Sequence, residues 1–125
     1  MFREITVMTT KKEEAIDITA LVEGVVQESR AREAGIFVYV PHSDAAVNIQ
    51  GATPEEPPLN RLLKKVLREE NGFEEPQTGA AFVAPTEVLI AVNGKLLLGE
   101  GQRIYFYEFN GPKARSVYVL VIPAL

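Results

Sequence analysis

The only histidine of the chain, His42, is followed by a hydroxyl and a carboxylate in the segment VPHSDAAVNI. An imidazole changes its charge near neutral pH, so His42 is a candidate general base or ligand, with Asp44 orienting it or binding a cation. The alternative is a turn, since Asp side chains commonly close turns by hydrogen bonding to nearby backbone. His42, Ser43 and Asp44 therefore form a candidate catalytic or ligand-binding corner.

A second group of polar residues lies toward the C-terminus. Glu108 and Arg115 fall on two predicted strands joined by a short turn, so one interpretation is a cross-strand ion pair. In the functional interpretation, Arg115 and Lys113 hold a phosphate, for which a guanidinium fork is suited. Gln102 either binds the same ligand or satisfies backbone groups at a strand end. The expected partner is a small phosphate-containing molecule.

Several other kinds of site are excluded by composition. The chain has no cysteine, which excludes thiol catalysis and Cys-based metal centres. A single histidine excludes a site of two or three histidines within one subunit, and no metal site is predicted. Dinucleotide, P-loop and zincin motifs are absent. With 17 acidic against 13 basic residues, the net charge of -4 argues against nucleic-acid binding. No apolar stretch is long enough to span a membrane, and we expect a cytoplasmic protein.

Hydrophobic periodicity predicts the elements that carry these residues. Apolar and polar residues alternate over residues 3–9 and 14–19, which indicates an opening hairpin. Apolar residues then recur at helical spacing, predicting a helix that is capped by Thr19 and ended by Gly35. The β-rich runs 35–40 and 45–49 follow, which places His42 on a loop between two strands.

The second half of the chain is predicted to contain one more helix and four strands. Residues 52–72 carry an apolar stripe at helical spacing after three prolines, whereas residues 73–85 look irregular. Asn93-Gly94 is the strongest short-range signal of a hairpin turn. Two further strands are predicted in residues 102–109 and 115–122. Tyr105, Phe106 and Tyr107 suit a strand with one face in the core and the other at a core or subunit contact.

These elements predict one domain over residues 1–125. Its expected fold class is α+β, a mostly antiparallel β-sheet or sandwich with two main helices in the order ββαββαββββ. The many strand ends favour oligomerisation, because an unpaired edge invites a partner.

The segment LGEGQRIYFYEFNGPKAR, residues 98–115, resembles the C-terminal signature of the YjbQ-like family. The matching residues are Leu98, Gly99, Gln102, Ile104, Glu108, Phe109, Gly111, Pro112 and Arg115. The segment HSDAA resembles the family's His-Thr-Thr-Ala-Ala motif. Gly101 and Asn110 replace the usual Trp and Asp, and residues 71–87 lack the family's other histidines and its Asp-Asn pair.

The resemblance implies the YjbQ-like fold, a homotrimer, and thiamine-phosphate synthase activity that joins a pyrimidine diphosphate to a thiazole phosphate with Mg²⁺. His42, Asp44 and Glu108 would be its catalytic residues. The ligand-binding residues would be Ser43, Gln102, Lys113 and Arg115. Because two of the three expected histidines are missing, we expect weak or lost synthase activity with a small-anion pocket near His42. The alternative is a non-catalytic oligomeric structural or binding protein.

Overall fold

A computed structural model of the chain describes residues 1–52, 59, 61–63, 65 and 75–125. The helix predicted in residues 52–72 lies largely outside these positions, although residues 59, 61–63 and 65 are helical. Among the described residues, no helix has the length and apolar character needed to cross a membrane.

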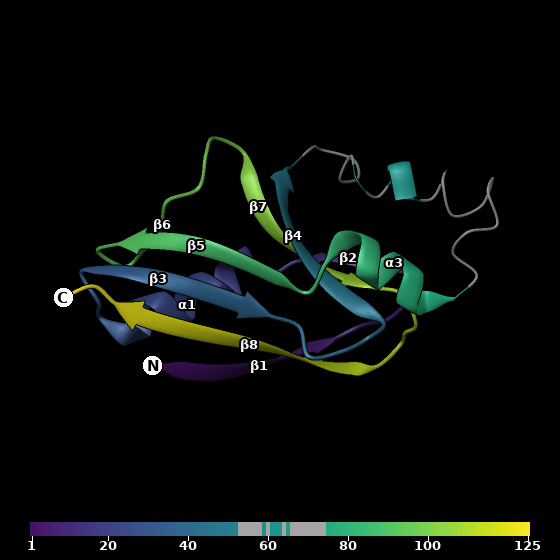
Figure 1. Cartoon of the computed structure of the whole chain (residues 1–125), viewed down its shortest axis with the longest axis horizontal. Coiled ribbons are helices and arrows are strands. Elements are labelled where there is room, and N and C mark those ends of the chain that lie inside the picture. Colours follow the sequence, from purple (N-terminus) through teal and green to yellow (C-terminus); the bar gives the residue numbers. More distant parts are fainter. Residues whose placement is uncertain (53–58, 60, 64, 66–74) are drawn as a thin grey trace.

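The fold consists of two antiparallel sheets that face each other (Figure 1). One sheet has five strands in the order β1-β8-β3-β5-β6, and the other has three in the order β2-β7-β4. The strands are β1 (Phe2–Met8), β2 (Glu14–Asp17), β3 (Glu33–Tyr39), β4 (Ala45–Gly51), β5 (Thr86–Val92), β6 (Lys95–Leu96), β7 (Gln102–Glu108) and β8 (Ala114–Pro123). The predicted α+β class with mostly antiparallel strands is confirmed.

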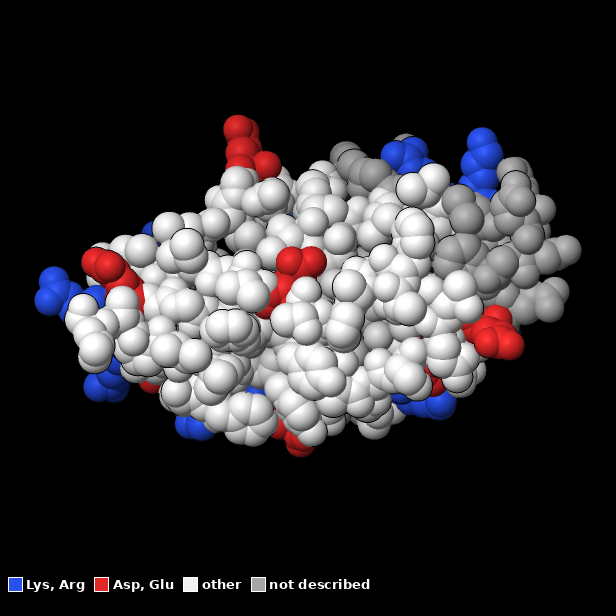
Figure 2. Space-filling view, viewed as in Figure 1, with Lys and Arg blue, Asp and Glu red and all other residues white. Residues whose placement is uncertain are grey.

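The outer surface of the five-stranded sheet carries exposed apolar side chains. We call it the outer apolar face, made of Phe2, Phe37, Tyr39, Val88, Ile90, Leu120 and Ile122. Phe2, Leu120, Phe37 and Val88 form one row across four strands, because the register pairs each with the next. Few charged side chains cover β3, β5 and β8 in Figure 2. A row of this kind is unusual on a surface that contacts only water.

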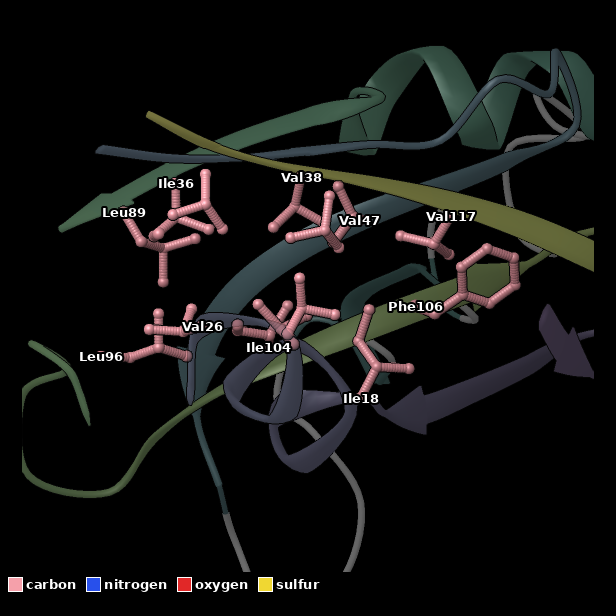
Figure 3. Close-up of a cluster of buried hydrophobic side chains, with 14 of the residues drawn as sticks. Ile18, Val26, Ile36, Val38, Val47, Leu89, Leu96, Ile104, Phe106 and Val117 are labelled. Carbon is pink, nitrogen blue, oxygen red and sulfur yellow. The ribbon is translucent and has the colours of Figure 1, made fainter. Parts of the chain in front are cut away.

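The main core fills the space between the sheets and beside helix α1 (Thr19–Ser29). Strict alternation sends Val117, Val119 and Val121 of β8 inward, and Ile104 and Phe106 of β7 meet them from the other sheet (Figure 3). Each such buried branched or aromatic side chain stabilises the fold by about 1.5–3 kcal/mol relative to exposure.

A second, smaller core lies on the far side of the three-stranded sheet. Helix α3 (Pro76–Val83) covers it, where an irregular segment was expected. The helix forms because Pro76 stands at its first turn, and it packs closely because Gly79 lies against the Phe109 ring. Tyr105 and Tyr107 are buried in this core, so this face of the strand packs within the chain.

The predicted opening hairpin is wrong. β1 pairs with β8 and β2 pairs with β7, so the first two strands belong to different sheets. Each of the two strands buries its apolar side chains by joining a sheet next to a C-terminal strand, β8 for β1 and β7 for β2. By contrast, the Asn93-Gly94 turn is confirmed, with φ of 51° and 82° linking β5 to β6.

The predicted ends of α1 are also wrong. Its C-terminal cap is Arg30, which adopts a left-handed φ of 57°, whereas Gly35 lies within β3. Thr19 is the first residue of the helix, and its hydroxyl accepts a hydrogen bond from the Ile104 amide at 2.8 Å. The Asp17 carboxylate instead accepts from the free Thr19 amide at 2.9 Å.

Candidate functional site

The candidate residues of the two sequence groups meet at one end of the space between the sheets. Glu108 is the last residue of β7 and lies two positions after Phe106, so its side chain is on the same inward face of the strand. Arg115 of β8 lies two positions before Val117 and likewise points inward. The two charged side chains therefore lie between the sheets, at the end of the row of inward-facing core residues. Their exposed fractions are 0% and 4%, so neither charge is hydrated.

Glu108 has hydrogen-bond partners for both of its carboxylate oxygens. Oε1 accepts from Arg115 Nε and from the Thr9 hydroxyl, each at 2.8 Å. Oε2 accepts from Arg115 Nη2 at 2.6 Å and from the backbone amides of Phe109 and Asn110. Burial raises the pKa of Glu108, but the hydrogen bonds from Arg115 and Thr9 outweigh it and lower the pKa overall.

Asp44 binds the other side of the same guanidinium. Its Oδ1 accepts from Arg115 Nη1 at 2.7 Å, and its Oδ2 lies 3.3 Å from the Asn110 amide and 3.5 Å from the Lys113 ammonium. Burial raises the pKa of Asp44, but the hydrogen bonds from Arg115 and Asn110 lower it to about 2. Hydrogen bonding to Glu108 raises the pKa of Arg115 further above its ordinary range, so the cation is permanent.

This ionic network leaves little for a ligand. Each of the three guanidinium nitrogens of Arg115 donates to a carboxylate, so the predicted phosphate-binding role of Arg115 does not fit its geometry. The predicted ion pair with Glu108 is present, but it joins two sheets and not neighbouring strands of one sheet. The predicted catalytic carboxylates Asp44 and Glu108 both pair with the Arg115 cation, which makes Glu108 unsuited to act as a base.

Mg²⁺ does not fit these carboxylates either. Both oxygens of Glu108 and Oδ1 of Asp44 already accept from Arg115, and a divalent ion would have to displace that cation. Within the described part of the chain, no three His, Asp or Glu side chains gather closely enough to hold a metal ion. We therefore assign the Asp44, Glu108 and Arg115 network a structural role at the end of the core.

His42 lies on the loop between β3 and β4, as predicted, and its ring contacts β8. The Ser116 amide donates a hydrogen bond to His42 Nε2 at 3.0 Å. Burial and the nearby Arg115 charge lower the pKa of His42, despite the opposite effect of Asp44. The ring is thus predominantly neutral at neutral pH.

A hollow of about 490 Å³ opens beside His42. We call it the His42 hollow; its lining residues are His42, Ser43, Ala45, Gln77, Ala80, Ala81 and Pro85. One wall is the loop before β4, and the opposite wall is α3. Lys113 extends its half-exposed ammonium toward Asp44, the residue after Ser43. Of the predicted site residues, His42 and Ser43 line this hollow, and Lys113 does not.

Gln102 does not join this group. It is the first residue of β7 and Glu108 is the last, so the two are roughly 20 Å apart at the usual rise of a strand. The Gln102 side-chain oxygen accepts from the Gly99 amide at 2.7 Å. The alternative role of Gln102, satisfying backbone at the strand end, matches this contact.

Three residues of the site were missed from the sequence. Thr9 continues the inward face of β1 and donates to Glu108, but nothing local marks it as a partner of a residue 99 positions away. Asn110 donates to Asp44, and only its place in the signature segment marked it. Gln77 lines the His42 hollow from α3, a helix that was not predicted.

Comparison with known proteins covers nearly the whole chain. A family model described as UPF0047 protein YjbQ-like matches residues 3–124. UPF0047 protein YugU of Bacillus subtilis is 32% identical in an alignment that covers 95% of this chain and 97% of that protein. A UPF0047 protein of Archaeoglobus fulgidus is 32% identical over 93% of this chain and 97% of its own length.

Solved structures show the same fold. An uncharacterised protein of the YjbQ/UPF0047 family from Clostridium acetobutylicum is similar with a TM-score of 0.83 and 31% identity, covering 96% of this chain and 99% of that one. A hypothetical protein from Aeropyrum pernix has a TM-score of 0.85 at 28% identity, with 99% of each chain covered. The two-sheet architecture is therefore shared across bacterial and archaeal relatives.

Proposed function

Because the chain belongs to the UPF0047 YjbQ-like family, we propose that it is a small-ligand-binding protein that holds a phosphate-bearing molecule in the His42 hollow. The observation that carries this proposal is the position of the hollow. It opens directly at the two polar residues, His42 and Ser43, that the resemblance had marked.

The lining of the hollow supports a ligand with one polar end. His42, Ser43 and Gln77 supply hydrogen-bonding groups, whereas Ala45, Ala80, Ala81 and Pro85 make the remaining surface apolar. Small-molecule sites commonly combine an apolar wall with a few placed polar groups. The proposed phosphate position is the His42 and Ser43 end. Lys113 is not a lining residue, but its half-exposed ammonium lies 3.5 Å from Asp44 Oδ2, next to Ser43 in the chain, and is proposed to reach a phosphate there in place of the enclosed Arg115.

We propose ligand binding, and not the transfer reaction of thiamine-phosphate synthase, as the function of this chain. Displacing a diphosphate with Mg²⁺ needs carboxylates that are free to bind the metal, and Glu108 and Asp44 are held by Arg115. We therefore propose that synthase-like activity is lost, and that binding in the cytoplasm is what remains.

The test compares ligand binding in matched lysine variants. Calorimetric titration with phosphate, diphosphate and thiamine phosphate precursors is expected to give binding in the wild type. Lys113→Met is expected to weaken it by about tenfold, since a charge-assisted hydrogen bond contributes roughly 1.5 kcal/mol. Lys95→Met is the control, because Lys95 lies on β6 away from the hollow. Absence of binding to every compound would disprove the proposal.

We propose, as a second function, assembly into a homotrimer through the outer apolar face. The support is the row of Phe2, Leu120, Phe37 and Val88, whose side chains are 39–58% exposed. Such a row of exposed apolar residues on a sheet is typical of a surface that is covered by another chain. A second copy is the proposed occupant because it makes an oligomer without any further component.

Light scattering after gel filtration tests the assembly. The wild type is expected to have three times the mass of the chain, which is 13.8 kDa. Phe37→Glu combined with Leu120→Lys should give a folded monomer, because both side chains lie on the outer apolar face. Leu62→Lys is a control at a similarly exposed apolar residue that does not belong to the strands of that face. A monomeric wild type would contradict the proposal.

A further inference from the structure

The hydrogen bond from the Ser116 amide to His42 forms just beyond the point where β3 stops pairing with β8. β3 pairs with β8 as far as Tyr39 and Tyr118, and Ser116 lies two residues further along β8. At this position β3 no longer offers a carbonyl group. The His42 Nε2 atom takes its place and accepts from the Ser116 amide at 3.0 Å. The side chain thereby completes the hydrogen bonding of the sheet.

This contact determines which ring nitrogen carries the proton. A backbone N–H can only donate, so Nε2 must present its lone pair, and the proton of the neutral ring is then on Nδ1. Among the described residues, no hydrogen bond to Nδ1 is formed. Since His42 lines the hollow, its second nitrogen is left for a ligand.

We infer that His42 is held as the neutral Nδ1–H tautomer and serves the hollow as a hydrogen-bond donor, so that its ligand presents an acceptor oxygen and not a metal ion. This inference rests on the proposed function for the identity of that oxygen as part of a phosphate. The donor role differs from the base and metal-ligand roles considered from the sequence.

Both other roles would disrupt the sheet. A metal ion bound at Nδ1 needs the proton on Nε2, where it would face the Ser116 N–H, and two donors would then oppose each other. A metal ion bound at Nε2 would displace Ser116 directly. Acting as a base through Nδ1 would produce the imidazolium, with the same clash of donors at Nε2.

The charges around the ring favour the same state. Arg115 opposes protonation of His42, whereas Asp44 and Glu108 favour it. Because Arg115 binds both carboxylates, their effect on the ring is partly neutralised, and burial and the Arg115 charge lower the pKa of His42 overall. In the part of the chain that the structure describes, Arg115, Asp44 and Glu108 are the charged residues that act on the ring, and it is burial together with Arg115 that favours the neutral form.

Nitrogen-15 NMR tests the tautomer without any ligand. Since the chain has one histidine, ¹⁵N-histidine labelling gives a single pair of ring nitrogens. At pH 7 the free protein should show a protonated Nδ1 and an unprotonated Nε2, and inorganic phosphate should shift Nδ1 more than Nε2. Zn²⁺ should leave both signals in place.

Two outcomes separate this inference from the proposed function. A protonated Nε2 or an imidazolium ring at pH 7 would overturn the inference, even if phosphate bound elsewhere. A protonated Nδ1 that phosphate does not affect would support the tautomer and overturn the phosphate-binding function.

Two substitutions separate the two nitrogens. The carbonyl of His42→Gln reaches the Nε2 position and can accept from Ser116, so this variant should keep the thermal midpoint and bind phosphate about tenfold more weakly. His42→Asn keeps a donor near the Nδ1 position but loses the Ser116 contact, so it should have a lower thermal midpoint and retain more binding. The reverse pattern would show that Nε2 serves the ligand and would overturn the inference.

Discussion

Glu108 and Arg115 face each other across the space between the two sheets, joined by hydrogen bonds of 2.6 and 2.8 Å. Each occupies an inward position of its strand, where the pattern of the core would otherwise place an apolar residue. The pair closes the core at the end where the His42 loop also lies. It therefore ties the sheets together beside the proposed ligand site.

Removing one partner of this ion pair should lower the free energy of unfolding more than removing both. Arg115→Met leaves the fully buried Glu108 carboxylate without its cation, which should lower the free energy of unfolding by about 3–5 kcal/mol. Adding Glu108→Gln should recover part of that loss. Urea unfolding of the two single variants and the double variant measures the coupling. A loss below about 1 kcal/mol in Arg115→Met would contradict a buried pair.

Acid should weaken the fold through Asp44. Its pKa is lowered from 3.8 to about 2, so its carboxylate contributes stability that is complete above pH 4 to 5 and is lost as pH falls through about 2. The total is about 2 kcal/mol. Urea unfolding of wild type and Asp44→Asn between pH 7 and pH 2 measures it. The variant should be less stable at pH 7 and show a smaller loss on acidification; equal losses would refute this assignment.

A methyl group at Gly111 should disrupt the same end of the core. A Cβ there would overlap the Lys11 carbonyl oxygen and lie 2.7 Å from the Thr9 hydroxyl. Gly111→Ala should therefore lower the free energy of unfolding by about 1–3 kcal/mol through overpacking. Gly24→Ala is the matched control, because Gly24 lies in α1 and, apart from its own helix, no described residue comes within 4 Å of a new Cβ.

The control variant Gly24→Ala is expected to change stability in the opposite direction. Replacing a helical glycine by alanine should raise the free energy of unfolding by about 0.5–1 kcal/mol. Chemical denaturation distinguishes the two variants directly. Equal effects of the two substitutions would show that the backbone near Gly111 can move aside.

Filling the His42 hollow should block the ligand without disturbing the core. Ala81 lines the hollow from α3 and its side chain is exposed, so Ala81→Leu adds volume where the ligand would lie. Phosphate-ligand affinity should fall at least about tenfold, with unchanged stability. Thr78→Leu is the control on the same helix at an exposed position that does not line the hollow. Equal affinities of the Ala81→Leu and Thr78→Leu variants would show that the ligand does not bind in the His42 hollow.

Local periodicity alone determined much of this protein. Alternating residues predicted β7 and β8, and so placed Glu108 and Arg115 close enough to pair. The Asn93-Gly94 turn was equally predictable, since a two-residue turn needs positive φ that Asn and Gly readily adopt. The segments that resemble the YjbQ-like family predicted the fold and marked His42 and Ser43.

Only the tertiary structure decided which groups meet. The sequence left Arg115 available for phosphate, but in the structure Asp44, 71 positions away, joins Glu108 in enclosing it. Gln102 lies on the same strand as Glu108 but at its far end. The partner of His42 is an amide 74 residues away. Strand pairing between distant segments sets these contacts, and it depends on burying apolar faces across the whole chain, so no local pattern of residues contains it.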